Sequence, residues 1–209
     1  MIKGINELIK MFDVGSTIDY NDTRYHYIID ELIYELIKTR KVNLIINYPF
    51  KDLENKIIED KIARDIYYFA KNVNGASIKR LENAIIETKD ANYICRFASD
   101  VKGANIESLE DAVIATGNAI TMYHFAKNVA KANTHRLEDI ITILGHPAAI
   151  YHFAKDINGA RIKNLENAII KSGNIEYMYY FARDIEGCDA EKIMQIVKAS
   201  HEEKNMLKK

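Results

Sequence analysis

A period of 28 residues runs through most of this 209-residue chain. The dipeptide Leu-Glu recurs at this spacing, starting at Leu53, Leu81, Leu109, Leu137 and Leu165. The dipeptide Phe-Ala keeps the same spacing, starting at Phe69, Phe97, Phe125, Phe153 and Phe181. No insertion or deletion interrupts the five units, and a truncated sixth begins at Ile193. Such regularity is typical of chains built by stacking one small structural unit.

Each unit predicts two short helices. In the third unit the first helix is expected from Ile106 to Ala115, after the potential N-cap Asn105 and before Gly117, which tolerates a left-handed C-terminal conformation. The second helix is expected to begin after Asn118. Its apolar positions follow the i, i+3, i+4, i+7 spacing of one helical face, and they are Met122, Phe125, Ala126 and Val129.

Helices of about 10 residues are marginal alone, so neighbouring pairs must stack to bury their apolar faces. We therefore predict an all-α fold, an α-solenoid (α/α superhelix) of about five to six 28-residue two-helix repeats. Residues 1–52 depart from the period, with apolar segments near residues 5–12, 28–37 and 42–46, and are predicted to form an N-terminal helical cap and degenerate repeat. Residues 53–209 are predicted to form the helical-repeat array, a single continuous domain.

Units such as LENAIIKSGNIEYMYYFARDIEGCDAEK resemble the α-solenoid class that includes HEAT and armadillo arrays. The resemblance covers about residues 50–200 and is one of architecture, because the repeats of those families are longer. The units are also similar to short helical repeats of uncharacterised bacterial and phage proteins. This resemblance implies a fold and a bacterial or phage source, and it implies no site.

The sequence contains no phosphate-binding loop and no dinucleotide-binding glycine motif. Cys95 and Cys188 lie in different columns of the repeat and form no apparent zinc pair. We therefore predict no catalytic residues, no metal site and no cofactor. A glutamate follows each repeat leucine, and we interpret this row as favouring the helix dipole and meeting Lys79, Arg80, Arg136 and Lys163. The row near the ends of the second helices is expected to accept hydrogen bonds from N–H groups of the following loop, and it comprises Asn72, Asp100, Asn128, Asp156 and Asp184.

Aromatic residues repeat on the second helices, and they supply the candidate partner-binding residues. One column holds Tyr67, Tyr123, Tyr151 and Tyr179, and the next holds Tyr68, Arg96, His124, His152 and Tyr180. The first column has two interpretations: packing between repeats, which we favour, or a concave recognition surface. The histidines likewise suit either a half-buried ladder, which we favour, or a ligand- or metal-binding ridge.

These features predict a non-enzymatic protein–protein interaction module, one version being a bacterial or phage regulator or inhibitor that binds another protein. The alternative is single-stranded nucleic-acid binding through the tyrosines and a basic row, Lys71, Lys127, Lys155 and Arg183. The net charge of −1 and the neighbouring acidic column disfavour it. An enzyme is a further rival, with His124, His152 and Arg96 as its candidates. The N-terminus lacks a secretory signal pattern and no apolar run reaches membrane-spanning length, so a cytoplasmic location without membrane association is expected.

Overall fold

The computed structural model describes residues 18–19, 37, 45–46 and 49–206. The predicted helical segments near residues 5–12 and 28–36 and the end of the polar tail lie outside the described residues. Two short strands, β1 (Ile18–Asp19) and β2 (Ile45–Ile46), pair in parallel with Ile18 opposite Ile45. Apart from this two-residue pairing, the regular elements of the described chain are eleven helices, so the fold is essentially all-helical.

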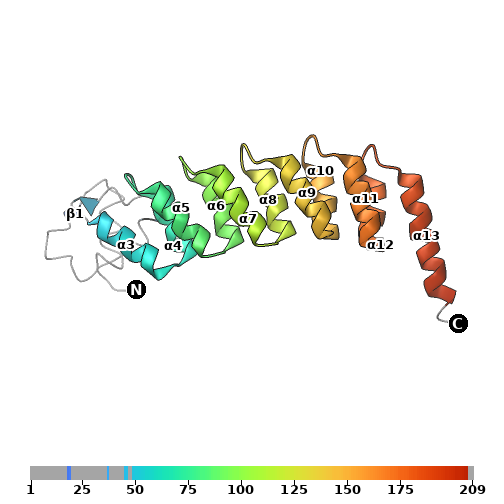
Figure 1. The fold of residues 1–209 in the computed structure, drawn as a ribbon, viewed down its shortest axis with the longest axis horizontal. Coiled ribbons are helices and arrows are strands. Elements are labelled where there is room, and N and C mark those ends of the chain that lie inside the picture. Colours follow the sequence, from blue (N-terminus) through green and yellow to red (C-terminus); the bar gives the residue numbers. More distant parts are fainter. Residues whose placement is uncertain (1–17, 20–36, 38–44, 47–48, 207–209) are drawn as a thin grey trace. The chain divides into compact units, whose positions relative to one another are not determined.

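The helices fall into two compact units, residues 1–105 and 106–209. The first unit holds α3 (Phe50–Asp60), α4 (Ala63–Asn72), α5 (Ile78–Glu87) and α6 (Ala91–Asp100). The second holds α7 (Ile106–Ala115), α8 (Ala119–Asn128), α9 (Thr134–Leu144), α10 (Pro147–Asp156), α11 (Ile162–Ser172), α12 (Ile175–Asp184) and α13 (Ala190–Met206). Within each unit the helices lie side by side in chain order (Figure 1). A single continuous domain over residues 53–209 stays a prediction.

The predicted helix boundaries in the third repeat are confirmed, since α7 runs from Ile106 to Ala115 and α8 begins directly after Asn118. The Asn118 side chain accepts a hydrogen bond from the backbone N–H of Thr121, which is N-capping. Ser77, which stands in the column of the potential N-cap Asn105, makes no cap bond with its side chain. Its own backbone N–H instead donates to the Glu54 carboxylate.

The cores of both units are built on the repeated phenylalanine of the second helices. All five are fully buried, and they are Phe69, Phe97, Phe125, Phe153 and Phe181. In the second unit α10 packs against α8 and α12, which are also second helices, and against the first helices α9 and α11. In the first unit α4 packs against α5 and α6. This packing fits a helical repeat.

The turn between the two helices of a repeat uses a left-handed residue. The column comprises Lys61, Lys89, Gly117, Gly145 and Gly173, all with φ between 52° and 68°. The next residue in this column is His201, and there the chain stays helical. With neither a glycine nor a left-handed residue to end it, α13 continues for 17 residues where the other repeats turn into a second helix.

Candidate functional site

The repeat glutamates join each repeat to the start of the next first helix. In all five cases the buried carboxylate accepts a hydrogen bond from the backbone N–H 23 residues later, with N···O distances of 2.6–3.0 Å. The donors are Ser77, Asn105, Asn133, Arg161 and Asp189. Because backbone N–H groups at a helix start have no partner within the helix, the glutamates satisfy them from the preceding repeat.

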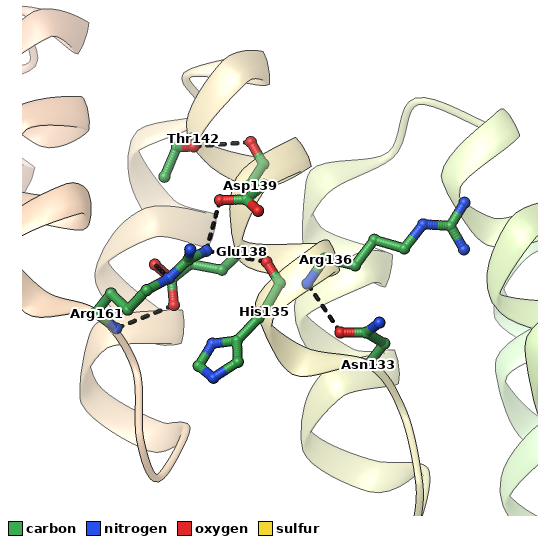
Figure 2. Close-up of polar contacts among 7 residues, drawn as sticks. All are labelled: Asn133, His135, Arg136, Glu138, Asp139, Thr142 and Arg161. Atoms are coloured by element: carbon green, nitrogen blue, oxygen red, sulfur yellow. Dashed lines mark hydrogen bonds and ion pairs between the residues drawn. The ribbon is translucent and has the colours of Figure 1, made fainter.

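Figure 2 shows the most elaborate of these contacts, around Arg161. Its backbone N–H and its Nε both donate to Glu138, while its Nη2 reaches Asp139 and the His135 carbonyl oxygen. Of the four predicted basic partners of the glutamate row, three are confirmed, namely Arg80, Arg136 and Lys163. Lys79, the fourth, forms no ion pair with a repeat glutamate among the described residues, and Glu54 pairs with the adjacent Arg80. The carboxylates thus hold helix starts together.

The tyrosine column lies between neighbouring second helices. Tyr67, Tyr123 and Tyr151 are only 3%, 5% and 6% exposed, whereas Tyr179 is 42% exposed. Three of these predicted binding residues therefore lie in packed positions, as the favoured interpretation expects. Of the four tyrosines, Tyr179 on α12 is the one that is exposed.

Each buried tyrosine belongs to a cluster of tyrosine, lysine and aspartate. The phenol of Tyr151 donates to Asp184 Oδ2, which lies on the next second helix at 2.5 Å, and Lys155 Nζ donates to the phenol oxygen at 2.9 Å. Lys155 Nζ also lies 3.4 Å from the Asp184 carboxylate and 5.2 Å from the Tyr151 ring centre. The same contacts join Tyr67, Lys71 and Asp100, and Tyr123, Lys127 and Asp156.

These clusters correct the expectation for the aspartate column. Asp100, Asp156 and Asp184 were expected to accept hydrogen bonds from the following loop, but each accepts from the tyrosine and lysine of the preceding repeat. An aspartate near a helix C-terminus is unfavourable against the helix dipole. An ammonium group and a phenol proton within hydrogen-bonding distance compensate for that position.

Two of the clusters, those of Tyr67 and Tyr123, raise the pKa values of their phenols and lower those of their carboxyl groups. Burial and the hydrogen bond to Asp100 both raise the pKa of the Tyr67 phenol, and Asp156 and burial act likewise on Tyr123. Partial burial by itself would raise the pKa of Asp100. Hydrogen bonds from Lys71, Tyr67 and Ser99 outweigh this effect and lower the pKa to about 2. At neutral pH the phenols of Tyr67 and Tyr123 are therefore protonated donors and Asp100 and Asp156 are charged acceptors, which suits a structural link better than acid–base chemistry.

The Asp100 cluster predicts an acid-dependent contribution to stability. Because folding lowers this pKa from 3.8 to about 2, the contribution is present above pH 4 and is lost as the pH falls through 2. We expect the Asp100→Asn variant to be about 1 kcal/mol less stable than wild type at pH 6, a value discounted for the partial exposure of the carboxylate. Urea unfolding followed by circular dichroism at pH 6, 4 and 2 measures the difference, which should shrink across this series.

The exposed Asp60→Asn variant is the matched control for the Asp100 experiment, since Asp60 lies outside the three clusters. Its unfolding free energy should follow that of wild type at each pH. A difference between wild type and Asp100→Asn that is the same at pH 6 and pH 2 would contradict the charged cluster.

The second candidate column forms the outer edge of the second helices. His124 and Arg96 are exposed, while Tyr68, His152 and Tyr180 are half-buried. The His152 ring stacks on Tyr123 of the preceding repeat with ring centres 5.6 Å apart, and the Tyr180 ring lies 6.1 Å from that of Tyr151. In the first unit the ring centres of Tyr68 and Tyr67 lie 5.0 Å apart, and the guanidinium carbon of Arg96 lies 5.5 Å from the ring centre of Tyr93.

The histidines have no metal-binding arrangement around them. Within residues 49–200 no group of three or more His, Cys, Asp or Glu side chains is placed to hold a metal ion. Burial lowers the pKa of His124, and the nearby Lys127 and His152 lower it further, so its neutral form is favoured. Burial also raises the pKa of the Cys95 thiol to about 11, which makes this cysteine a poor nucleophile.

The basic row is largely neutralised within the chain. Lys71, Lys127 and Lys155 are ion-paired with Asp100, Asp156 and Asp184. Arg183 also pairs with Asp184 and lies over the rings of Tyr179 and Tyr180. A phosphate group would have to compete with these carboxylates for the same cations.

The tyrosine, lysine and aspartate columns are each evident in the sequence, but the hydrogen bonds that join them were not predicted. The spacing that joins them is Lys four residues and Asp 33 residues after Tyr. A sequence signal existed, because Cys95, Ser99 and Asn128 occupy the same three columns. The tyrosine and lysine of the second unit and the aspartate that would meet them from the third unit are thus replaced together, which is typical of residues that interact.

Among the described residues, no helix combines the length and apolar character needed to cross a bilayer. No protein-family model, curated protein sequence or solved structure matches this chain.

Proposed function

We propose that this chain is an α-solenoid that acts as a non-enzymatic protein–protein interaction module in the cytoplasm. The proposed contact surface is the outer ridge, defined as the outward-facing side chains of His124, His152 and Tyr180 on α8, α10 and α12. A regulator or inhibitor of another protein, of bacterial or phage origin, is one form that such a module takes.

The observation that carries this proposal is the ring ladder of the second unit. His152 stacks on Tyr123, and Tyr180 lies against both Tyr151 and Tyr177. The phenols of Tyr123 and Tyr151 are themselves tied to Asp156 and Asp184. Partly exposed rings that are already held in position lose little conformational entropy when a partner covers them, which favours binding.

The charges of the outer ridge favour a protein partner over single-stranded nucleic acid. Lys127 and Lys155 flank the ridge, but each is ion-paired with an aspartate of the next repeat. Nucleic-acid affinity depends on cations that are free to replace the counterions of phosphates. The paired lysines therefore support the protein-binding role.

Two histidine substitutions test the proposal. We expect the His124→Ala/His152→Ala variant to recover at least about tenfold less partner than wild type in affinity capture from extracts of the producing organism, because loss of two anchoring rings costs more than 1 kcal/mol. Quantitative mass spectrometry measures the recovery, and circular dichroism checks that the variant is folded. His135→Ala is the matched control, since this histidine is exposed on the first helix α9.

Equal recovery of every captured protein by wild type, the double variant and His135→Ala would refute the outer ridge as the binding surface. Salt-dependent binding of labelled single-stranded RNA, weakened by Lys127→Ala, would instead favour the nucleic-acid alternative.

A further inference from the structure

Among the residues that the structure describes, the flank of α12 around Tyr179 is an unfilled copy of a site that is filled three times elsewhere. Tyr67 is covered by α6, Tyr123 by α10 and Tyr151 by α12, and each is buried. Tyr179 occupies the same column, yet it is 42% exposed. Its hydroxyl makes no hydrogen bond with any residue of the described part of the chain.

The course of α13 explains why this flank is open among the described residues. α13 packs against α12 in the place of a first helix and then continues through His201 without turning back. A hollow of about 600 Å³ lies between the two helices, with Tyr179, Ile175 and Val197 in its lining. The hollow therefore lies beside the residue that corresponds to the covered Tyr67, Tyr123 and Tyr151.

The three filled copies define the chemistry of the occupant. In each copy the covering element is an α-helix, which places at least one ring against the tyrosine and a carboxylate within hydrogen-bonding distance of the tyrosine hydroxyl. In α12 these groups are Tyr177, Tyr180 and Asp184, spaced i, i+3 and i+7 on one helical face. In α6 the contacting ring is Tyr93 and the carboxylate is Asp100, again at i and i+7.

We propose that the α12 flank binds an amphipathic helix of a partner protein, with an aromatic side chain facing Tyr179 and an aspartate or glutamate seven residues later accepting a hydrogen bond from its hydroxyl. Arg183 stands where the other clusters have lysine, and its guanidinium lies over the Tyr179 ring while it pairs with Asp184 of the same helix, so the partner's carboxylate would share this positive charge with Asp184. Docking of a helix in a groove through an i, i+3, i+7 face is a common mode of peptide recognition. This inference is separable from the outer ridge, because the contact centres on Tyr179, and Tyr180 is the one ridge residue that also lines the hollow.

A peptide from the chain itself provides the probe. Residues 174–187, NIEYMYYFARDIEG, form the helix that covers Tyr151, so their contact face is the one expected to cover Tyr179. A hydrocarbon staple on the opposite face keeps this short segment helical, since a helix of about 10 residues is marginal alone. Fluorescence anisotropy of the labelled, stapled probe measures its binding to the 209-residue protein.

We expect saturable binding of this probe and at least about tenfold weaker binding of a probe with Asp184→Ala, because the charged acceptor of the hydrogen bond is removed. The protein variant Tyr179→Phe should weaken the native probe by a similar factor. Combined with the Asp184→Ala probe it should cause little further loss, since both changes remove the same hydrogen bond. The His124→Ala/His152→Ala protein should bind the probe like wild type, which separates this test from that of the outer ridge.

Three outcomes would overturn the proposal. The first is binding no stronger than that of a stapled peptide of scrambled sequence. The second is probe binding that is weakened by Tyr151→Phe and not by Tyr179→Phe, because the probe would then be displacing α12 from its contact with Tyr151. The third is a dimer in analytical ultracentrifugation that Tyr179→Ala dissociates, which would make a second copy of the chain the occupant.

Discussion

The Phe153→Ala variant is expected to lose about 3–5 kcal/mol of unfolding free energy, the range for removing a large aromatic side chain from a core. Phe153 is fully buried on α10, which packs against α8, α9, α11 and α12. Neighbours on all these helices cannot close in together without breaking their own packing. The substitution therefore leaves a cavity as well as lost apolar burial.

Urea unfolding monitored by circular dichroism measures this change, with the transition midpoint and its slope compared between variant and wild type. Ile143→Ala is the control, because Ile143 is a large apolar side chain that is 78% exposed on α9. Its unfolding free energy should stay within about 0.5 kcal/mol of wild type. A loss below about 1 kcal/mol for Phe153→Ala would mean that the phenylalanine column does not form the core of the repeats.

The Glu138→Ala variant is expected to lose about 2–3 kcal/mol of unfolding free energy, because a buried acceptor of a backbone N–H and a guanidinium N–H is removed. Glu138 is fully buried, and the Arg161 N–H at the start of α11 has its hydrogen bond only across the repeat boundary. Truncation leaves this donor without its acceptor. Urea unfolding again provides the measurement, and Glu138→Gln should fall between Ala and wild type because its amide oxygen still accepts one bond.

Asp139→Ala offers a matched control for Glu138→Ala, since Asp139 is the adjacent carboxylate and pairs with the same arginine. Its side chain is exposed, and exposed ion pairs contribute only about 0–1 kcal/mol. Equal losses for the two variants would contradict the role of the glutamate row in joining repeats, because the buried backbone contact would then add nothing to the exposed pair.

The sequence predicted local structure well and the partners of polar side chains poorly. The bounds of α7 and the start of α8 follow from capping residues, a turn glycine and apolar spacing, all of which act within a few residues. The burial of Tyr67, Tyr123 and Tyr151 agrees with the favoured packing interpretation, but their hydrogen bonds to aspartates of the next repeat were not anticipated. Such contacts depend on how far one helix is shifted along its neighbour, and propensity carries no information on that shift.

The sequence by itself determined the 28-residue period, the two helices of each repeat and the identity of the core phenylalanines, because these depend on side-chain spacing along one helix and on the conformations of single turn residues. Only the tertiary structure decided that Glu138 satisfies the N–H of Arg161, that Tyr151 donates to Asp184, and that Tyr179 alone in its column stays largely exposed. Those outcomes join residues 23 to 33 positions apart, or depend on the helix that follows. They are set by the packing of whole helices, which buries some members of a repeated column and leaves another open.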